Sequence, residues 1–491
     1  MQLPLTVSPQ SDTALQTQIY GQILQLIRHG ALAPDTRVPS TRELATQLGV
    51  SRNTVVMAYQ RLIVEGFLDT HFGAGTRVGR TLPSEFFEVR TRSQAAAESP
   101  SEKAVVPVLP FRGRRPQLFD LRRNRLRYDF RIGRPDESLF PLKTWRRLLI
   151  QNLGGARSAL TQYGDPAGLL KLRAAVANHL RVARGIRAEP EQVIVVAGCQ
   201  EALNLVARLL VKEGSKVVLE NPCYQGAAFV FESFGGHLIP IEVDDEGINA
   251  VQLPRQLVQL AYVTPSHQFP LGVTMSLARR LKLLDWASET GAYVMEDDYD
   301  SDFRYQGPPL MALQALDAQG RVIYSGTFSK SIGAGLRMGY VVVPPRLVDA
   351  ATTVKALMNN GHPWLEQAVV ADFILSGGFD MHLRRIRQEY LQRQECLQDR
   401  LRLRFGDCTL SGLEGGMHAA WRLPADLPRA YPMQQALHRM SVGIYSLQDG
   451  PAHQLNGFPG DDQIALLGYP CLTEREIVEA VDLIAGSITR S

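Results

Sequence analysis

From about residue 126 onward, short apolar runs of strand length alternate with longer amphipathic stretches. The apolar runs are QVIVV, KVVLE, LAYV, AYVM and RVIY, and helical patterns such as EALNLVARLLVKEG and LARRLKLLDWASETG separate several of them. Strands that alternate with helices are typical of a mostly parallel sheet with helices on both faces. We therefore predict an α/β domain that spans residues 126–491.

Polar or small residues follow every one of these runs, in the order AGCQ, NPCY, TPSHQ, EDDYD and SGTFSK. Open parallel sheets bind ligands at the carboxyl ends of their strands. Core packing alone does not account for so many polar strand ends. The pattern therefore indicates a ligand site along this edge of the sheet.

The amino-terminal part, residues 11–80, has the pattern of a small helical domain. Its first helix has apolar residues at helical spacing, with Ser11 or Asp12 as the expected cap. A second helix opens on Ser40, which forms a capping box with Glu43, and a third helix opens on Ser51. The expected buried face of the third helix consists of Val55, Ala58, Tyr59 and Leu62. With the segment FLDTHFGAGTRVGR as a wing, these helices predict a winged helix-turn-helix.

The opening of the third helix carries the physical argument for DNA. Arg52, Asn53 and Thr54 project from its amino end, where base edges are contacted when such a helix enters the major groove. Between Ser51 and Leu62 there are two arginines and no acid. The alternative is an ordinary helical hairpin with exposed polar residues.

The order of these elements matches a known family. PSTRELATQLGVSRNTVVMAYQRLIVEGFL, with the wing HFGAGTRV, resembles the winged-helix domain of GntR-type repressors over about residues 12–80. The resemblance implies binding to a double-stranded DNA operator. The implied DNA contacts are Arg42, Ser51, Arg52, Asn53, Thr54 and the wing-tip residue Gly75.

Residues 81–125 separate the two domains. The stretch QAAAESPSEKAVVPVLP is typical of a flexible linker, and the basic stretch FRGRRPQLFDLRRNRLR follows it. The basic part either docks on the large domain as a solvated connector or touches DNA or an acidic surface. The net charge of +4 is too small to indicate a nucleic-acid partner for the chain as a whole.

The rest of the composition indicates a cytosolic protein without membrane contact. Its five cysteines are scattered and contain no C-x-x-C pair, which argues against a disulfide framework or a zinc site and for a reducing compartment. No other metal site is predicted. The start MQLPLTVSPQSD lacks the pattern of a secretory signal, and no apolar run reaches the roughly 18 to 20 residues that span a bilayer.

Lys330 follows the run RVIY among serine, threonine and glycine residues. A lysine amine can form a Schiff base with a carbonyl, and pyridoxal phosphate is the cofactor that uses this chemistry. Its ring nitrogen needs a carboxylate, which Asp297 can supply after the run AYVM, and Tyr299 can reach the phenolic oxygen. Tyr224, at another strand end, can stack on the ring.

The cofactor phosphate needs hydroxyl groups, an arginine and a helix amino terminus. Thr327, Ser329 and Arg337 supply the first two, and Gly198, Cys199 and Gln200 open the helix EALNLVARLL. Each group has an ordinary alternative, since a lone lysine is usually a surface charge and a run of acids is usually a solvated turn. Their joint placement at successive strand ends is much more specific.

Six segments carry a second resemblance: YGDPAGLLKLRAAVANHL, VVAGCQEALNLVARLL, ENPCY, TPSHQFPLG, EDDYDSDFRY and SGTFSKSIGAGLRMGY. Together they resemble fold-type I aminotransferases, and with the GntR-type head the chain resembles a MocR/GabR-type transcriptional regulator. By that resemblance Lys330 holds pyridoxal phosphate as an internal aldimine, Asp297 pairs with the pyridine nitrogen and Tyr299 bonds the phenolate. The implied phosphate contacts are Arg337, Thr327, Ser329 and, from the neighbouring subunit of a head-to-tail homodimer, Tyr163.

The chain departs from aminotransferases at two positions. They usually carry N-P-T-G where this chain has Phe269-Pro270-Leu271-Gly272, so the asparagine that contacts the phenolate is missing, and Tyr299 and Gln268 are candidates to compensate. They also carry an arginine that grips the substrate α-carboxylate, where this chain has Leu466. The second change weakens the case for turnover of ordinary α-amino acids.

Three functions remain open from the sequence. The leading hypothesis is a pyridoxal-phosphate-dependent transcription factor that senses a small amine or amino acid, or pyridoxal phosphate itself, through aldimine chemistry at Lys330. The second is an active aminotransferase with an accessory DNA-binding head. The third is a DNA-binding protein with a cofactor-free scaffold, which predicts no aldimine absorbance.

Overall fold

The computed structural model describes residues 2–11, 13–71, 75–79, 126–307, 310–448, 452–458 and 460–488. Contacts within the chain separate two compact units, Met1–Leu109 and Pro110–Ser491. The expected linker, residues 81–125, and Gly73 of the expected wing lie outside the described residues. None of the helices in the described parts of the chain is long and apolar enough to cross a membrane.

The first unit contains the predicted winged helix-turn-helix. Its elements are α1 (Leu15–Arg28), α2 (Thr41–Leu48), α3 (Arg52–Val64), β1 (Leu68–His71) and β2 (Gly75–Val78). The two strands pair antiparallel. Ile19, Ile23, Leu44, Val55 and Leu62 are fully buried between the three helices. Burial of this apolar face, rather than helix propensity, stabilises such short helices.

Side-chain caps fix the starts of α2 and α3. Ser40 accepts a bond from the Glu43 amide at 3.2 Å, and the Glu43 carboxylate accepts one from the Ser40 amide at 2.7 Å. Ser51 caps α3 through the Thr54 amide at 3.1 Å. The expected cap of α1 at Ser11 or Asp12 is wrong, because α1 begins after Ala14 with no side-chain cap.

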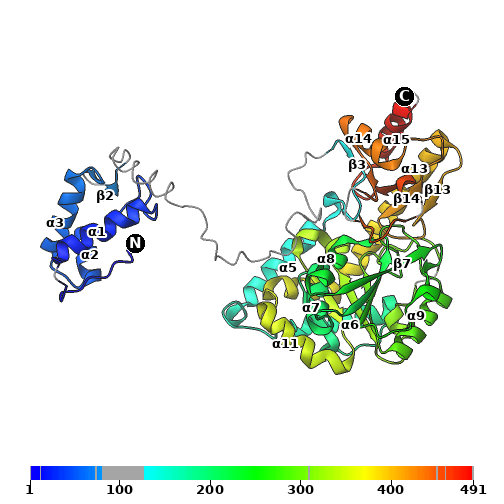
Figure 1. Ribbon diagram of the computed structural model, residues 1–491, viewed down its shortest axis with the longest axis horizontal. Coiled ribbons are helices and arrows are strands. Elements are labelled where there is room, and N and C mark those ends of the chain that lie inside the picture. The colour runs from blue at the N-terminus through cyan, green and yellow to red at the C-terminus, as the bar shows by residue number, and fades with distance from the viewer. Residues whose placement is uncertain are drawn as a thin grey trace, which may run out of the picture. The chain divides into compact units, whose positions relative to one another are not determined.

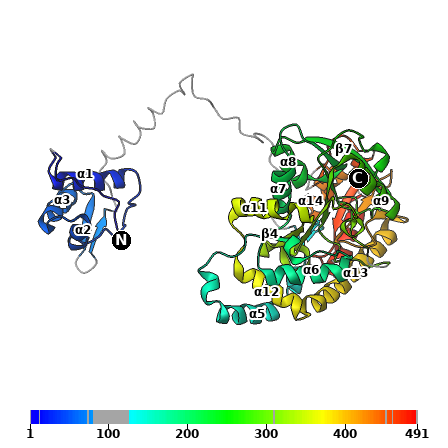
Figure 2. The same cartoon turned by 90° about the horizontal axis from the view of Figure 1, so that it is seen from below.

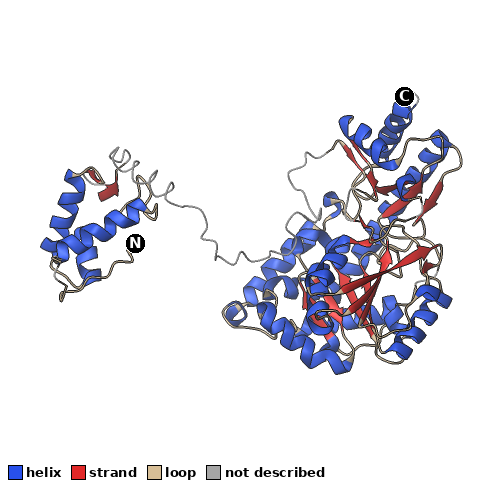
Figure 3. Cartoon of the chain, viewed as in Figure 1, coloured by secondary structure: helices blue, strands red, loops and turns tan. Residues whose placement is uncertain are grey.

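The second unit is built around a mixed sheet, which has eight strands among the described residues (Figure 3). In spatial order these are β4 (Val193–Val196), β12 (Gly339–Val342), β11 (Val322–Thr327), β10 (Tyr293–Asp298), β9 (Leu260–Val263), β5 (Lys216–Asn221), β7 (His237–Asp244) and β8 (Gly247–Ile248). β12 runs antiparallel to β11 and β4, and β8 runs antiparallel to β7. The five predicted runs all form strands, and their carboxyl ends share one edge.

Helices cover both faces of this sheet because successive strand residues point to opposite sides. Val217 and Leu219 of β5 pack under α7 (Cys199–Leu210), α8 (Gln225–Ser233) and α11 (Val348–Asn359), which lie side by side in Figure 1. Val218 faces α9 (Leu277–Thr290) on the other side. That side also carries α5 (Leu142–Gly155), α6 (Leu170–Arg184) and α12 (Trp364–Leu375), which are neighbours in Figure 2.

A smaller antiparallel sheet closes the carboxyl-terminal part. Its strands are β13 (Thr409–Ser411), β14 (His418–Arg422), β18 (Ile464–Gly468) and β16 (Tyr445–Ser446), and it is packed with α13 (Gly378–Phe405), α14 (Ala430–Arg439) and α15 (Glu474–Ile488). The remaining short elements are α10 (Leu313–Leu316) and the strand pairs β3 (Tyr128–Asp129) with β15 (Val442–Gly443) and β6 (Cys223–Tyr224) with β17 (Ala452–His453).

Candidate functional site

Asp297 lies inside β10, because the strand continues past the run AYVM as far as Asp298. Successive side chains of a strand alternate between faces, so Asp297 points to the α7 side and its neighbours Glu296 and Asp298 point to the α6 side. Asp297 has only 4% of its surface exposed. The strand thus brings a single buried carboxylate to the amino end of α7.

Two donors hold the Asp297 carboxylate at the same oxygen. Cys199 Sγ donates to Asp297 Oδ2 at 3.0 Å, and the Tyr262 hydroxyl donates to it at 2.7 Å. Burial raises the pKa of Asp297, and the two hydrogen bonds oppose this rise. Cys199 was expected at the phosphate, but its thiol contacts Asp297. Tyr262, on β9, was not identified from the sequence.

Lys330 lies in η5 (Ser329–Gly333), a turn of π-helix that follows β11. Its Nζ donates to the carbonyl oxygen of Gly133 at 2.6 Å. Gly133 has a φ of +69°, a conformation that favours glycine, and a Cβ there would lie 2.9 Å from Nζ and crowd the amine. Burial lowers the pKa of the Lys330 ammonium, which favours the neutral, nucleophilic amine.

The expected phosphate ligands gather beside the amino end of α7. The Thr327 hydroxyl donates to Ser329 Oγ at 3.0 Å, and the Ser329 amide donates to Thr327 Oγ1 at 3.1 Å. Arg337 is exposed and donates through Nη2 to the Ala197 carbonyl at 2.6 Å. Gly198 has a φ of +89°, and a Cβ there would lie 3.1 Å from Arg337 Nη2. Hydroxyls, a guanidinium and helix amides thus converge as an anion site requires.

Three of the other predicted residues border this site, and one lies apart. Gln200 donates through Nε2 to the Tyr224 hydroxyl at 3.0 Å. Tyr299 lies just beyond Asp298, and its hydroxyl is 3.0 Å from His267 Nδ1. Tyr163 has 90% of its surface exposed, so within one subunit it contacts little.

Gln268 was considered a substitute for the missing asparagine, but its side chain is occupied elsewhere. Its Nε2 donates to the carbonyls of Pro222 and Phe269, each at 2.8 Å, and its Oε1 accepts from the Leu271 amide at 3.0 Å. These bonds direct the amide into its own loop. Tyr299 is therefore the better placed of the two candidates.

A buried cluster of His267, Asp300 and His418 was also not identified from the sequence. His267 Nδ1 donates to Asp300 Oδ2 at 2.9 Å, and His418 Nε2 donates to the Pro270 carbonyl at 2.9 Å. Burial lowers the pKa of His418 to about 3, so this imidazole is neutral. His267 lies in the strand end TPSHQ, the only signal that pointed to it, whereas His418 comes from the distant small sheet.

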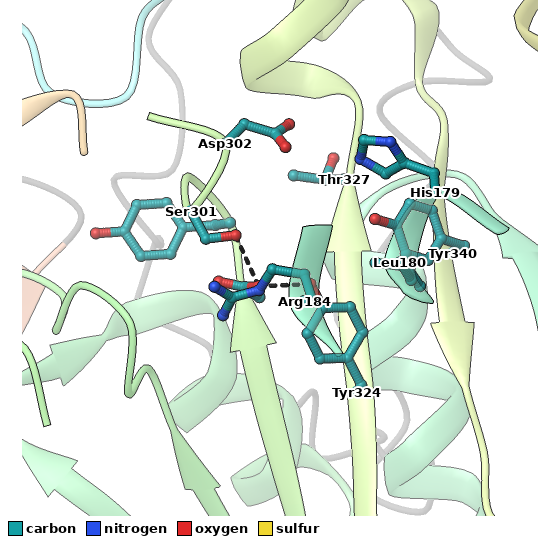
Figure 4. A pocket seen from close by; sticks show the side chains of 10 residues that line it. His179, Leu180, Arg184, Ser301, Asp302, Tyr324, Thr327 and Tyr340 are labelled. Carbon is teal, nitrogen blue, oxygen red and sulfur yellow. Dashed lines mark hydrogen bonds and ion pairs between the residues drawn. The ribbon is translucent and has the colours of Figure 1, made fainter. Parts of the chain in front are cut away.

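On the other face of β10, Asp298 anchors the strand end in a buried polar network (Figure 4). Arg184 Nε lies 2.9 Å from Asp298 Oδ2, which also accepts from Tyr324 at 2.5 Å and Ser301 at 2.7 Å. These side chains surround a cavity of about 10 Å³, enough for one water. The network fixes the position of the neighbouring Asp297 and Tyr299.

The donor set fits pyridoxal phosphate. Asp297 offers a carboxylate to the ring nitrogen, and Lys330 offers an amine to the aldehyde. Arg337, with the hydroxyls and the amino end of α7 beside it, offers positive charge and hydrogen-bond donors to the phosphate dianion. The glycines that leave room at Lys330 and Arg337 would clash with both side chains if they carried a Cβ. Together these residues would suit each charged or reactive group of the cofactor.

Glu220, at the floor of the site, predicts a pH-dependent stability. Its Oε2 accepts from Thr264 Oγ1 at 2.6 Å, and burial raises its pKa from 4.5 to about 7. Below pH 4.5 the carboxyl is protonated in both the folded and unfolded states. As the pH rises from 4.5 to 7, the unfolded state loses the proton first, so the free energy of unfolding falls and stays lower above pH 7.

Glu220→Gln should remove this dependence. Between pH 5 and pH 8, the stability of the variant relative to the wild type should rise by about 2–3 kcal/mol. Thermal melts of the cofactor-loaded protein across this pH range measure the change. Any pH-independent effect of the buried glutamine amide on the free energy of unfolding cancels, because only the change between pH 5 and pH 8 is compared. A difference between the two proteins that does not vary with pH would contradict the prediction.

In the first unit, the candidate nucleic-acid interface is the exposed surface of α2 and α3. Arg42, Arg52 and Asn53 are exposed, and Arg52 Nε lies 3.4 Å from Thr41 Oγ1. An open groove between the helices is lined by Arg42, Ala45, Thr46, Gly49, Val50 and Arg52. The side chains of Ser51 and Thr54 bond each other at 2.8 Å as part of the helix cap. Gly75, at the start of β2, lies against the Arg37 side chain.

Comparisons with known proteins agree with both units. Residues 15–78 match the model of bacterial regulatory proteins of the gntR family, and residues 129–447 match that of aminotransferase class I and II. The chain is 37% identical over 489 residues to the probable rhizopine catabolism regulatory protein MocR of Rhizobium meliloti, covering 98% of this chain and 95% of that protein.

Two further proteins extend the comparison. The HTH-type pyridoxine biosynthesis transcriptional regulator PdxR of Corynebacterium glutamicum is 33% identical over 420 residues, or 85% of each chain. The crystal structure of Pyrococcus horikoshii kynurenine aminotransferase, a complex with PMP, is 27% identical with a TM-score of 0.67. The structural match covers 75% of this chain and 92% of the kynurenine aminotransferase chain. The large unit is thus similar to a pyridoxal-phosphate enzyme.

Proposed function

Because this chain belongs to the MocR-type regulators of the GntR family, we propose that a small amine or amino acid competes with Lys330 for the cofactor and thereby changes operator binding. The protein is a pyridoxal-phosphate-dependent transcription regulator with a DNA-binding winged helix. The observation that carries the proposal is the partly buried Lys330 amine near the buried Asp297 carboxylate, at one edge of the sheet. We place this regulator in the cytoplasm.

The proposal divides the chain into a DNA-binding head at residues 1–80, a connector at 81–125 and an effector domain at 126–491. When bound, pyridoxal phosphate supplies an aldehyde that combines reversibly with primary amines. Asp297 binds and orients the ring nitrogen, and Tyr299 contacts the phenolic oxygen. Tyr224 packs on the ring, and the phosphate is held by Thr327, Ser329, Arg337 and the α7 amino end formed by Gly198, Cys199 and Gln200.

Effector binding regulates transcription only if the effector binds two conformers with different affinity, because equal affinity shifts no equilibrium. The Lys330 side chain provides such a difference. The free Lys330 amine donates to the Gly133 carbonyl and so connects η5 to the segment after β3. A lysine joined to the cofactor aldehyde cannot make the same contact, so an amine that releases Lys330 changes it. In a variant of the proposal, pyridoxal phosphate itself is the signal and no further amine is needed.

The protein is expected to bind DNA and to form a dimer through its aminotransferase-like domain. We propose that the two subunits of this dimer are arranged head-to-tail. Apolar residues exposed on the described subunit support a large interface at α5 and the following turn: Leu142, Ile150, Leu153 and Leu160. Tyr163 follows this segment and is exposed, as a residue that reaches the phosphate of a neighbouring subunit must be.

The experiment that tests the proposal follows two signals in one titration. Candidate amines and amino acids are added to the purified cofactor-loaded protein, and the visible absorbance and the affinity for operator DNA are recorded together. A parallel change in both signals is expected for the effector. A spectral change that leaves operator affinity constant for every amine would contradict the proposed coupling.

Arg52→Ala tests the DNA-binding surface. If Arg52 reads a base edge, its removal should weaken binding to the preferred operator by about 1–3 kcal/mol and relax sequence preference at one position. Binding assays with operator variants at fixed salt measure this loss. Arg61→Ala is the matched control, because Arg61 is paired with Glu65 at 3.0 Å near the other end of α3. An unchanged sequence preference would reassign Arg52 to a phosphate contact or to solvent.

An enzyme with an accessory DNA-binding head remains the second candidate, because Lys330 and Asp297 are both retained. Leu466 argues against it, since it replaces the arginine that would bind a substrate carboxylate. Transamination assays with amino donors and a 2-oxo acid separate the two functions. Sustained turnover at ordinary enzyme rates would contradict the hypothesis that the protein is a regulator without catalytic activity.

A further inference from the structure

An apolar cluster packs against Tyr224 and Tyr299 of the candidate site. Its buried members are Ile132, Val243, Phe269, Leu271, Ala420, Leu447, Ala452, Ile464 and Leu466. Ile132 immediately precedes Gly133, whose carbonyl accepts the bond from Lys330 Nζ. Leu466 is fully buried, and Phe269 has 9% of its surface exposed. The cluster therefore reaches the segment that accepts the bond from the Lys330 amine.

Phe269 connects this cluster to the side chains expected around the cofactor ring. Its ring centroid lies 5.7 Å from that of Tyr224 and 5.9 Å from that of Tyr299, and both contacts are edge to face. Leu466 pairs with Ala420 and Tyr445 across the small sheet. Leu466 occupies the position where an aminotransferase has the arginine that binds a carboxylate, and Phe269 occupies the position of the asparagine that contacts the phenolate, so neither side chain offers a polar group to a carboxylate.

The charged groups around the same position are mainly acidic. Asp300 opposes the burial-induced lowering of the Lys330 pKa more than any other charged group does. Burial raises the pKa of the Tyr299 phenol, and the negative charges nearby raise it further; these are Asp300, Asp297, Glu220 and Asp298. A bound carboxylate would be buried among like charges and hydrocarbon, and both conditions disfavour it.

Two arginines occur close to Gly133 in the chain: Arg134 lies beside Asp129, and Arg131 acts on Tyr445. Arg134 Nη1 lies 3.6 Å from Asp129 Oδ2, and the Tyr445 hydroxyl donates to Asp129 Oδ1 at 2.6 Å. Burial raises the pKa of Tyr445, and Arg131 opposes this rise. Asp129 thus already pairs with Arg134 near Gly133.

We infer that the effector recognised at Lys330 is a primary amine with an apolar body and no α-carboxylate, rather than an α-amino acid. The inference rests on the proposed function, because it names the ligand class of the same site. It follows from the residues of the site: Leu466 in place of the carboxylate-binding arginine, Phe269 in place of a polar asparagine, and Asp300 as a nearby acid.

Pairs of ligands that differ only in the carboxylate provide the test. Phenethylamine is compared with phenylalanine, and isopentylamine with leucine, by calorimetry and visible absorbance on the cofactor-loaded full-length protein. In each pair the amine should bind at least about tenfold more tightly. Equal or tighter binding of the amino acids, or no binding of either amine, would overturn the inference.

Three variants locate the origin of the preference. Leu466→Arg supplies a cation, so it should narrow or reverse the preference, and Leu466→Met, which conserves volume, should retain it. Arg131→Gln should also leave the preference unchanged. A strong loss of amino-acid binding in Arg131→Gln would identify Arg131 as a carboxylate ligand and overturn the inference. The wild-type comparison decides the matter even if Leu466→Arg does not fold.

Operator binding recorded in the same titrations separates this inference from the proposed function. Amines that bind preferentially but leave operator affinity unchanged would support the ligand class and contradict the coupling to DNA. Amino acids that bind preferentially and do change operator affinity would support the coupling and contradict the ligand class.

Discussion

Lys330→Ala is expected to abolish the absorbance of the lysine–cofactor Schiff base and the change in operator affinity that an amine causes, while the affinity for operator DNA without amine persists. The reason is that Lys330 offers the resident amine of the site, buried against Gly133 and close to Asp297 and Asp300. Absorbance spectra and operator-binding titrations with and without amine measure the two properties.

Two further variants control for charge and for the loss of a lysine elsewhere. Lys330→Arg keeps the positive charge but cannot form a Schiff base, so it should behave like the alanine variant. Lys282→Ala removes an exposed lysine from α9 and should behave like the wild type. Persistence of amine-dependent operator binding in Lys330→Ala would favour a scaffold that works without the cofactor.

Asp297→Ala is expected to weaken cofactor binding by about 100-fold or more, because removing one partner of a buried charge pair typically costs about 3–5 kcal/mol. In addition, the Cys199 thiol and the Tyr262 hydroxyl lose their shared acceptor. Equilibrium dialysis of pyridoxal phosphate against the apoprotein measures the affinity directly.

The matched control for this prediction is Asp285→Ala, which removes an exposed carboxylate from α9 and should leave cofactor affinity unchanged. Tyr262→Phe should weaken binding less than Asp297→Ala does, since it removes a single neutral hydrogen bond. Cofactor affinity within a few fold of the wild type in Asp297→Ala would rule out its pairing with the ring nitrogen.

The local elements could be predicted because their signals lie within short stretches. Ser40 and Glu43 form the expected capping box, and the third helix begins at Ser51 as predicted. The cap of α1 could not be placed in the same way. Ser11 and Asp12 have suitable side chains, but the helix begins only after Ala14. Burial of the α1 apolar face, which a capping preference does not measure, determines where that helix packs.

Only part of the candidate site could be predicted, because some of its residues come from segments that are far apart in the chain or resemble core residues. Lys330, Asp297 and Arg337 were proposed from the sequence because each follows or ends a recognisable strand. Tyr262 was not, because a tyrosine within a buried run has the same pattern as a core residue. His418 was not either, since it reaches the site only through the packing of the small sheet on the large one.

The sequence alone predicted the two kinds of domain and the edge of the sheet that carries the polar groups, and it led to the hypothesis that Lys330 forms a Schiff base. These follow from periodicity and from residue type, which are local properties. The tertiary structure alone decided which oxygen of Asp297 receives two hydrogen bonds and where the Cys199 thiol points. It also decided that Leu466 and Phe269 join one apolar cluster beside the amine. Such contacts depend on how strands distant in sequence pack together, and spacing along the chain does not encode that packing.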